Sequence, residues 1–169
     1  MPRITAQHLA RAIEAVRAMS MERKAALADE VFQQQPTLFG VFLVQTRLGV
    51  SFEKMEFLLE LLLVSFLSMR ETGLQWPRIS EDELDRQAAR LSATVNFAEG
   101  LGPALAGQSV AQYINGHPEQ YLFAYVTTEV TGWLGKVQPE ESDKYVMLAA
   151  MNIANCIAYA PCPRHSPGS

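Results

Sequence analysis

Acidic residues at helical spacing are the residues of this sequence best suited to chemistry. Glu53, Glu56 and Glu60 are separated by three and four positions, so a helix through them would place their carboxylates on one side. Asp82 and Asp85 repeat the three-residue spacing further along the chain. Carboxylate oxygens are preferred ligands of hard divalent cations. One hypothesis is therefore a magnesium site built from these five side chains.

The two acidic segments also resemble a known metal-binding pattern. The segments 53–56 (EKME) and 82–85 (DELD) resemble the acidic pairs of the all-α nucleoside triphosphate pyrophosphatases of the MazG and dUTPase-like group. Those proteins bind magnesium through E-x-x-E and E-x-x-D pairs, and the second pair departs from that pattern because it reads D-x-x-D. The resemblance covers about residues 52–90. It implies a magnesium-dependent nucleoside triphosphate pyrophosphohydrolase, and magnesium is the one cofactor that we consider.

Helix capping offers another interpretation of the same carboxylates. Glu53 follows Ser51, and Asp82 and Asp85 follow Ser80, in the opening turns of two expected helices. Serine is a preferred N-cap residue, and carboxylates in the first turn complement the helix dipole. These acidic residues are therefore also expected on capped helices that bind no metal.

Glu60 is the acidic residue that capping does not explain. It stands between Leu59 and Leu61 in a mostly apolar segment. A buried carboxylate needs a partner. If Glu60 is buried, we expect it to pair with a basic residue such as Arg47 or Arg70.

A second candidate site lies near the C-terminal end. Asn152, Asn155 and Tyr159 have the spacing of one helix face in an otherwise apolar segment. They would either line a small-molecule pocket or satisfy one another and nearby backbone groups. Trp133 stands two residues before Gly135, where it is either part of the core or an anchor for a partner.

Other catalytic chemistry finds little support. No local motif joins His8, His117 or His165 to a nucleophile. No glutamate has histidine three residues later, which excludes the ligand pattern of di-iron carboxylate bundles. Cys156 and Cys162 are expected to be free thiols, because two cysteines do not make a disulfide framework.

Composition predicts an ordinary globular domain. The 169 residues are 49% hydrophobic and 19% charged, with a formal net charge of −4. No run of Lys or Arg is available to follow a phosphate backbone, so we expect no nucleic-acid partner. Residues 1–19 interleave charged and apolar side chains, unlike a signal peptide, and the apolar segment 57–67 is too short to span a membrane. We therefore expect a cytoplasmic protein.

Apolar spacing and capping residues predict an all-α domain of seven or eight helices over residues 1–160. Residues 161–169, which contain Pro161 and Pro163, are expected to form a disordered tail. Two apolar helices, 52–69 and 145–158, should form the centre. Predicted helices begin after Thr5 and Ser20 and then cover 38–48, 52–72, 80–99, 109–115, 118–135 and 139–160.

The two halves of the chain show a similar pattern. Segment 31–36 (VFQQQP) matches segment 113–118 (YINGHP) at an offset of 82 residues, and each precedes an apolar helix. One interpretation is a duplicated four-helix unit with halves 6–73 and 80–160. Such packings leave surfaces that bind proteins. The sequence thus favours a non-enzymatic interaction or regulatory module with a protein partner or a second copy. The magnesium-dependent hydrolase and a helical small-ligand-binding protein are the alternatives.

Overall fold

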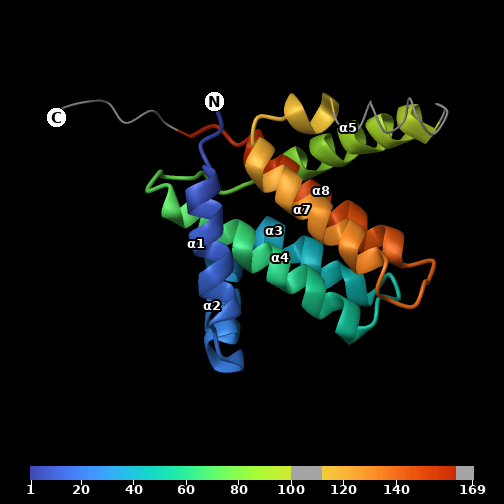
Figure 1. The fold of residues 1–169 in the computed structure, drawn as a ribbon, viewed down its shortest axis with the longest axis horizontal. Helices are drawn as coiled ribbons and strands as arrows, with labels where there is room; N and C mark the ends of the chain where they lie inside the picture. Colours follow the sequence, from blue (N-terminus) through green and yellow to red (C-terminus); the bar gives the residue numbers. More distant parts are fainter. Residues whose placement is uncertain (100–111, 163–169) are drawn as a thin grey trace.

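The computed structural model is an assembly of α-helices packed around two central ones (Figure 1). It describes residues 1–99 and 112–162, and these ranges contain no strand. Residues 112–115 form a helical turn that carries no label in the figure. The labelled elements are α1 (Ala6–Arg17), α2 (Met21–Gln34), α3 (Pro36–Leu43), the 3-10 turn η1 (Val44–Thr46), α4 (Phe52–Glu71), α5 (Glu81–Glu99), α7 (Gln120–Leu134) and α8 (Asp143–Ala158).

Helices α4 and α8 form the centre, as predicted. Both are buried over most of their length, α4 through residues such as Leu58 and Leu62 and α8 through residues such as Ile153 and Ile157. A helix that is apolar around most of its circumference must be covered on several sides. Here α1, α2 and α3 contact α4, while α3, α5 and α7 contact α8, and the two central helices contact each other.

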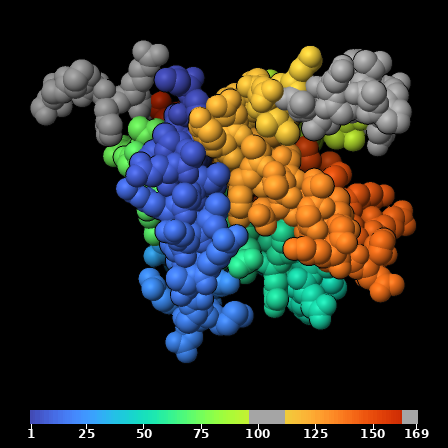
Figure 2. All heavy atoms as spheres, viewed as in Figure 1, coloured from blue at the N-terminus to red at the C-terminus, as the bar shows by residue number. Residues whose placement is uncertain are grey.

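The covering helices form the surface of the molecule. On the face shown in Figure 2, the blue helices α1 and α2 form one edge and the orange helix α7 lies beside α1, which it contacts. Helix α5 lies along α8 at one end of the molecule (Figure 1). Within the described ranges, no helix is long and apolar enough to cross a membrane.

The predicted N-caps place four helix starts correctly. The hydroxyls of Thr5, Ser20, Ser51 and Ser80 each accept the backbone N–H three residues later. Each bond satisfies one of the donors that a helix start leaves unpaired. The carboxylate of Glu83, three residues after Ser80, accepts a hydrogen bond from Gln87 Nε2 at 2.8 Å and does not return to the Ser80 N–H in a capping box.

Two predicted boundaries are wrong. Segment 38–48 is divided between α3, which starts at Pro36 and ends at Leu43, and η1. The last helix starts at Asp143, four residues after Pro139. The Asp143 carboxylate accepts a hydrogen bond from the Glu140 N–H and forms an ion pair with Lys54, and these contacts hold the preceding loop in place. The predicted helix 109–115 and the tail lie partly outside the described residues.

The predicted duplication is not confirmed. At the offset of 82 residues, segment 44–48 should correspond to 126–130. Segment 44–48 follows the end of α3, forms η1 and a turn, and is followed by Gly49, which has a φ of +83°. Segment 126–130, in contrast, lies within α7. The two halves therefore differ within the apolar segments that suggested their similarity.

Gly49 gives a first prediction about stability. Its positive φ strains any residue with a Cβ, although an added Cβ would meet no atom within 4 Å. We therefore expect Gly49→Ala to lower the free energy of unfolding by about 1 kcal/mol. Gly132 in α7 has equally open space but carries no positive φ, so Gly132→Ala should raise stability slightly. Urea unfolding of both variants measures the difference, and equal effects would contradict the conformational explanation.

Candidate functional site

A pocket of about 640 Å³ opens between α3, α5 and α8. Its volume lies within the range of about 300–1,000 Å³ that small-molecule sites usually have. Three helices far apart in the sequence contribute to it, so it exists only in the folded chain. Its walls are mostly apolar and include Pro36, Val41, Val44, Leu48, Leu84, Ala88, Leu148 and Ala149.

Two buried amide oxygens belong to residues that line this pocket. Gln45 is 2% exposed, and its Nε2 donates to the Val41 carbonyl at 3.0 Å. Since a carbonyl only accepts, this bond determines the orientation of the amide and leaves Gln45 Oε1 without a partner in the described part of the chain. Asn152 Oδ1 is also buried and unpartnered there. A buried acceptor without a hydrogen bond destabilises the fold by about 1–3 kcal/mol, so a hydrogen-bond donor at either oxygen would be stabilising.

The charged residues lining the pocket are acidic. Glu81 and Asp85 come from the first turns of α5 and are exposed at the pocket. Neither forms an ion pair within the described ranges, and no Lys or Arg there lines the pocket. Arg47 lines a neighbouring hollow, and Lys144 packs over the Tyr145 ring. The pocket therefore combines apolar walls with acceptors and negative charge.

The acidic residues of the magnesium hypothesis are not brought together. Glu53, Glu56 and Glu60 line a second hollow of about 470 Å³, whereas Asp85 lines the pocket described above and Asp82 lines neither. Across residues 1–99 and 112–162, no three His, Cys, Asp or Glu side chains form a set that could hold a metal ion. The magnesium site stays a prediction, and this placement gives it no support.

The ion pair of Glu60 differs from the one predicted. Glu60 is half-exposed and pairs with Lys24 at 3.1 Å. Arg70, a predicted partner, pairs with Glu30 instead. Arg47, the other predicted partner, lies on the loop after η1 and lines a hollow that Glu60 does not reach. The condition of that prediction, a buried Glu60, is not met, because the side chain is half-exposed and lines the second hollow.

Trp133 belongs to the contact between α7 and α4. Its ring stacks on Phe57 with centroids 4.7 Å apart and planes within 2°. The ammonium of Lys54 lies 6.0 Å from the ring centroid. Trp133 is half-buried and also lines the second hollow, so it combines a packing role with partial exposure.

Asn155 does not line the pocket, because it binds a buried histidine. Its Oδ1 lies 2.7 Å from His117 Nε2, and His117 Nδ1 accepts the Glu119 N–H at 3.1 Å. One acceptor and one donor nitrogen describe a neutral imidazole protonated at Nε2. Burial lowers the pKa of His117, which favours the same neutral form. The helical spacing of Asn152 and Asn155 indicated that they share one face of a helix. It did not indicate that Asn152 lines the pocket while Asn155 contacts His117.

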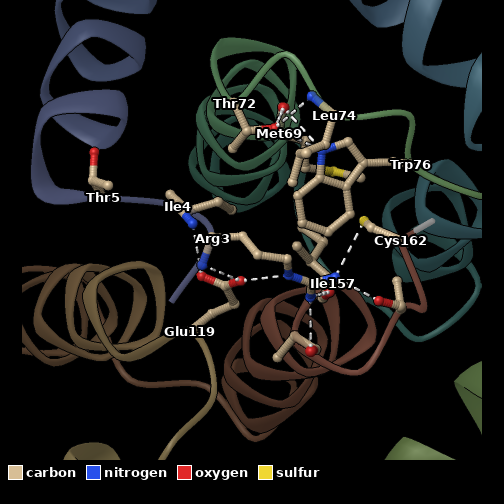
Figure 3. A network of polar contacts seen from close by, with 12 residues as sticks. Arg3, Ile4, Thr5, Met69, Thr72, Leu74, Trp76, Glu119, Ile157 and Cys162 are labelled. Carbon is tan, nitrogen blue, oxygen red and sulfur yellow. Dashed lines mark hydrogen bonds and ion pairs between the residues drawn. The ribbon is translucent and has the colours of Figure 1, made fainter. Parts of the chain in front are cut away.

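Sequence analysis missed a polar network around Arg3 (Figure 3). Arg3 Nε donates at 3.0 Å to Glu119, a carboxylate that is 1% exposed and also accepts the backbone N–H groups of Arg3 and Ile4. The guanidinium further donates to the carbonyls of Ile157, Ala158 and Ala160 and lies 4.4 Å from the Trp76 ring centroid. No local motif marks this network, since its members come from both ends of the chain and from the loop before α7.

Both cysteines are free thiols, as predicted. Burial raises the pKa of Cys156 to about 12, so this thiol is protonated and unreactive at neutral pH. Cys162 lies close to Arg3, which donates to its sulfur at 3.2 Å, and burial raises its pKa as well. Neither group has the lowered pKa that a thiolate nucleophile needs.

Comparisons of the chain with protein-family models, curated proteins and solved structures find no significant match. A functional proposal for this protein rests on the chemistry of its own residues. The pocket between α3, α5 and α8 combines apolar walls with two residues, Gln45 and Asn152, whose amide oxygens are unpaired in the described part of the chain.

Proposed function

We propose that this protein is a non-catalytic binding protein that holds a small organic molecule in the pocket between α3, α5 and α8. The observation that carries the proposal is an apolar pocket lined by Gln45, whose buried amide oxygen Oε1 has no partner in the described part of the chain. A ligand donor would complete the hydrogen bonding of this oxygen after a rotation of the Gln45 side chain toward the pocket, since protein atoms enclose the oxygen. The proposal corresponds to the small-ligand alternative of the sequence analysis, with Asn152 retained as a lining residue and Asn155 removed.

The apolar walls would supply most of the affinity. Burying apolar surface is worth about 25 cal/mol per Å², and the pocket offers such surface on three helices. The amides would then orient the ligand. The interaction-module and magnesium hypotheses stay predictions.

A cavity-filling variant tests the proposal. Ala88 is half-buried and lines the pocket, whereas its neighbour Ala89 is exposed and does not. With the neutral fluorescent probe N-phenyl-1-naphthylamine, we expect saturable binding to the native protein and to Ala89→Leu. We expect binding to be weaker by about tenfold or more in Ala88→Leu, because the added side chain occupies the probe's volume.

Circular dichroism and thermal unfolding of both leucine variants control for folding. An absence of saturable binding to the native protein would contradict the proposal. Equal affinity of Ala88→Leu and Ala89→Leu would also contradict it, since the probe would then bind elsewhere.

A further inference from the structure

We infer that the pocket selects a protonated amine on an apolar body, an amphiphilic ammonium ion. This inference rests on the proposed function and specifies the head group of its ligand. It is carried by the type of polar atom that the pocket leaves unpaired and by the sign of the charges at its mouth.

The unpaired amide atoms at the pocket are acceptors. Gln45 Oε1 is assigned as an acceptor by the bond that its Nε2 donates to Val41 O. Asn152 contributes a second buried oxygen. An ammonium group has three N–H donors and no acceptor, so it can supply the donor that each oxygen lacks once the side chain turns toward the pocket. A carboxylate or phosphate ligand has acceptors in place of donors and would leave both oxygens unpaired.

The charges at the pocket favour the same head group. Glu81 and Asp85 line it, and no cation lines it in the described part of the chain. Opposite charges attract over several ångströms at a protein surface, while an anionic ligand would be repelled. The apolar walls argue for an organic cation over a bare metal ion, which would gain nothing from aliphatic surface.

Three probes with one ring system and different head groups test the inference. 1-Naphthylmethylamine, 1-naphthalenemethanol and 1-naphthoate are titrated into the full-length protein at pH 7 and low salt, with binding followed by calorimetry. We expect the protonated amine to bind about tenfold more tightly than the alcohol and the carboxylate to bind least. Raising the salt should reduce the preference for the amine, since the rim charges are exposed and become screened.

Two matched acidic variants locate the charge effect. Asp85 lines the pocket, whereas Asp82 stands three residues earlier in α5 and does not line it. Asp85→Asn should lower amine affinity several-fold and leave alcohol affinity unchanged. Asp82→Asn should change neither. Equal losses in the two variants would overturn the assignment, because they would indicate a general effect of net charge.

A third variant tests the buried oxygen. Gln45→Met keeps the approximate shape of the side chain and removes the unpaired acceptor. We expect amine affinity to fall several-fold while thermal stability changes little, since the variant loses the bond from Nε2 to Val41 O together with the unpaired acceptor. A purely structural glutamine would show the reverse, with lower stability and unchanged affinity, and this result would overturn the inference.

The outcomes separate the inference from the proposed function. Equal binding of the three probes, abolished by Ala88→Leu, would overturn the amine preference and leave the binding pocket in place. Binding of none of them would remove support for both. Displacement of the amine by Ca²⁺ or Mg²⁺ would also overturn the inference, because it would identify the oxygens as metal ligands.

Discussion

Replacing Arg3 with alanine is expected to lower the free energy of unfolding by about 3 kcal/mol. The change would leave the buried Glu119 carboxylate without its cationic partner and three carbonyls at the end of α8 without their donors. An uncompensated buried charge is costly, since it has lost water without gaining a counter-charge. Urea unfolding at pH 7 measures the loss.

Two further arginine variants control this prediction. Arg11→Ala removes an exposed ion pair with Glu71 of 3.8 Å and should cost about 0.5 kcal/mol or less. Arg3→Lys should restore only part of the stability, because one ammonium cannot reproduce the guanidinium fork that serves Glu119 and the α8 carbonyls together. If Arg3→Ala proved as mild as Arg11→Ala, the network would have no special role in stability.

Acidification below about pH 6.5 is expected to destabilise the protein through His117. Burial lowers the pKa of this imidazole in the folded state, so the unfolded chain binds the proton at a higher pH than the folded one. Stability is therefore complete above the unfolded pKa and falls as pH drops toward the folded pKa. One proton taken up on unfolding corresponds to a slope of at most about 1.4 kcal/mol per pH unit.

One hydrogen bond of His117 gives the same sign, whereas the Nε2 bond to Asn155 Oδ1 and the charge of Glu119 raise the pKa and are outweighed by burial. Protonating Nδ1 would replace an acceptor of the Glu119 N–H with a second donor facing it. The pKa of Asp143 is lowered, since hydrogen bonds from Lys54 and the Glu140 N–H outweigh the effect of burial, so its own contribution is lost only at more acidic pH. The two groups therefore act in separate pH ranges.

Denaturant unfolding between pH 5 and pH 8 checks the histidine prediction. His117→Gln keeps hydrogen-bonding atoms near Asn155 and has no ionisation in this range. We expect the variant to lose most of the slope that the native protein shows between pH 5 and pH 6.5. The same slope in both proteins would contradict the assignment to His117.

Sequence pattern determined much of the helical framework. Hydroxyl caps at Thr5, Ser20, Ser51 and Ser80 mark helix starts because they bond to backbone groups only three residues away. Apolar residues surround most of α4 and α8, so these helices must be buried in any topology. Both signals are local, which is why they can be found without knowing which helices become neighbours.

Some helix boundaries and the long-range ion pairs could be assigned only from the tertiary structure. Asp143 opens α8 through a bond to its own loop and a contact with Lys54, 89 residues earlier. Glu119 is buried through Arg3, 116 residues away. Such partners bring no periodic signal, and neither does Lys24, which pairs with Glu60 from 36 residues earlier.

The candidate site was only partly determined by the sequence. Spacing gave a pocket as one of two interpretations of Asn152 and made Asp85 a candidate metal ligand. It grouped them with Asn155 and with Glu53, Glu56 and Glu60, which lie elsewhere. Helical spacing tells which side chains share a face of one helix. Only the packing of α3, α5 and α8 decided that Gln45, Asp85 and Asn152 share one pocket, because that depends on contacts between distant segments.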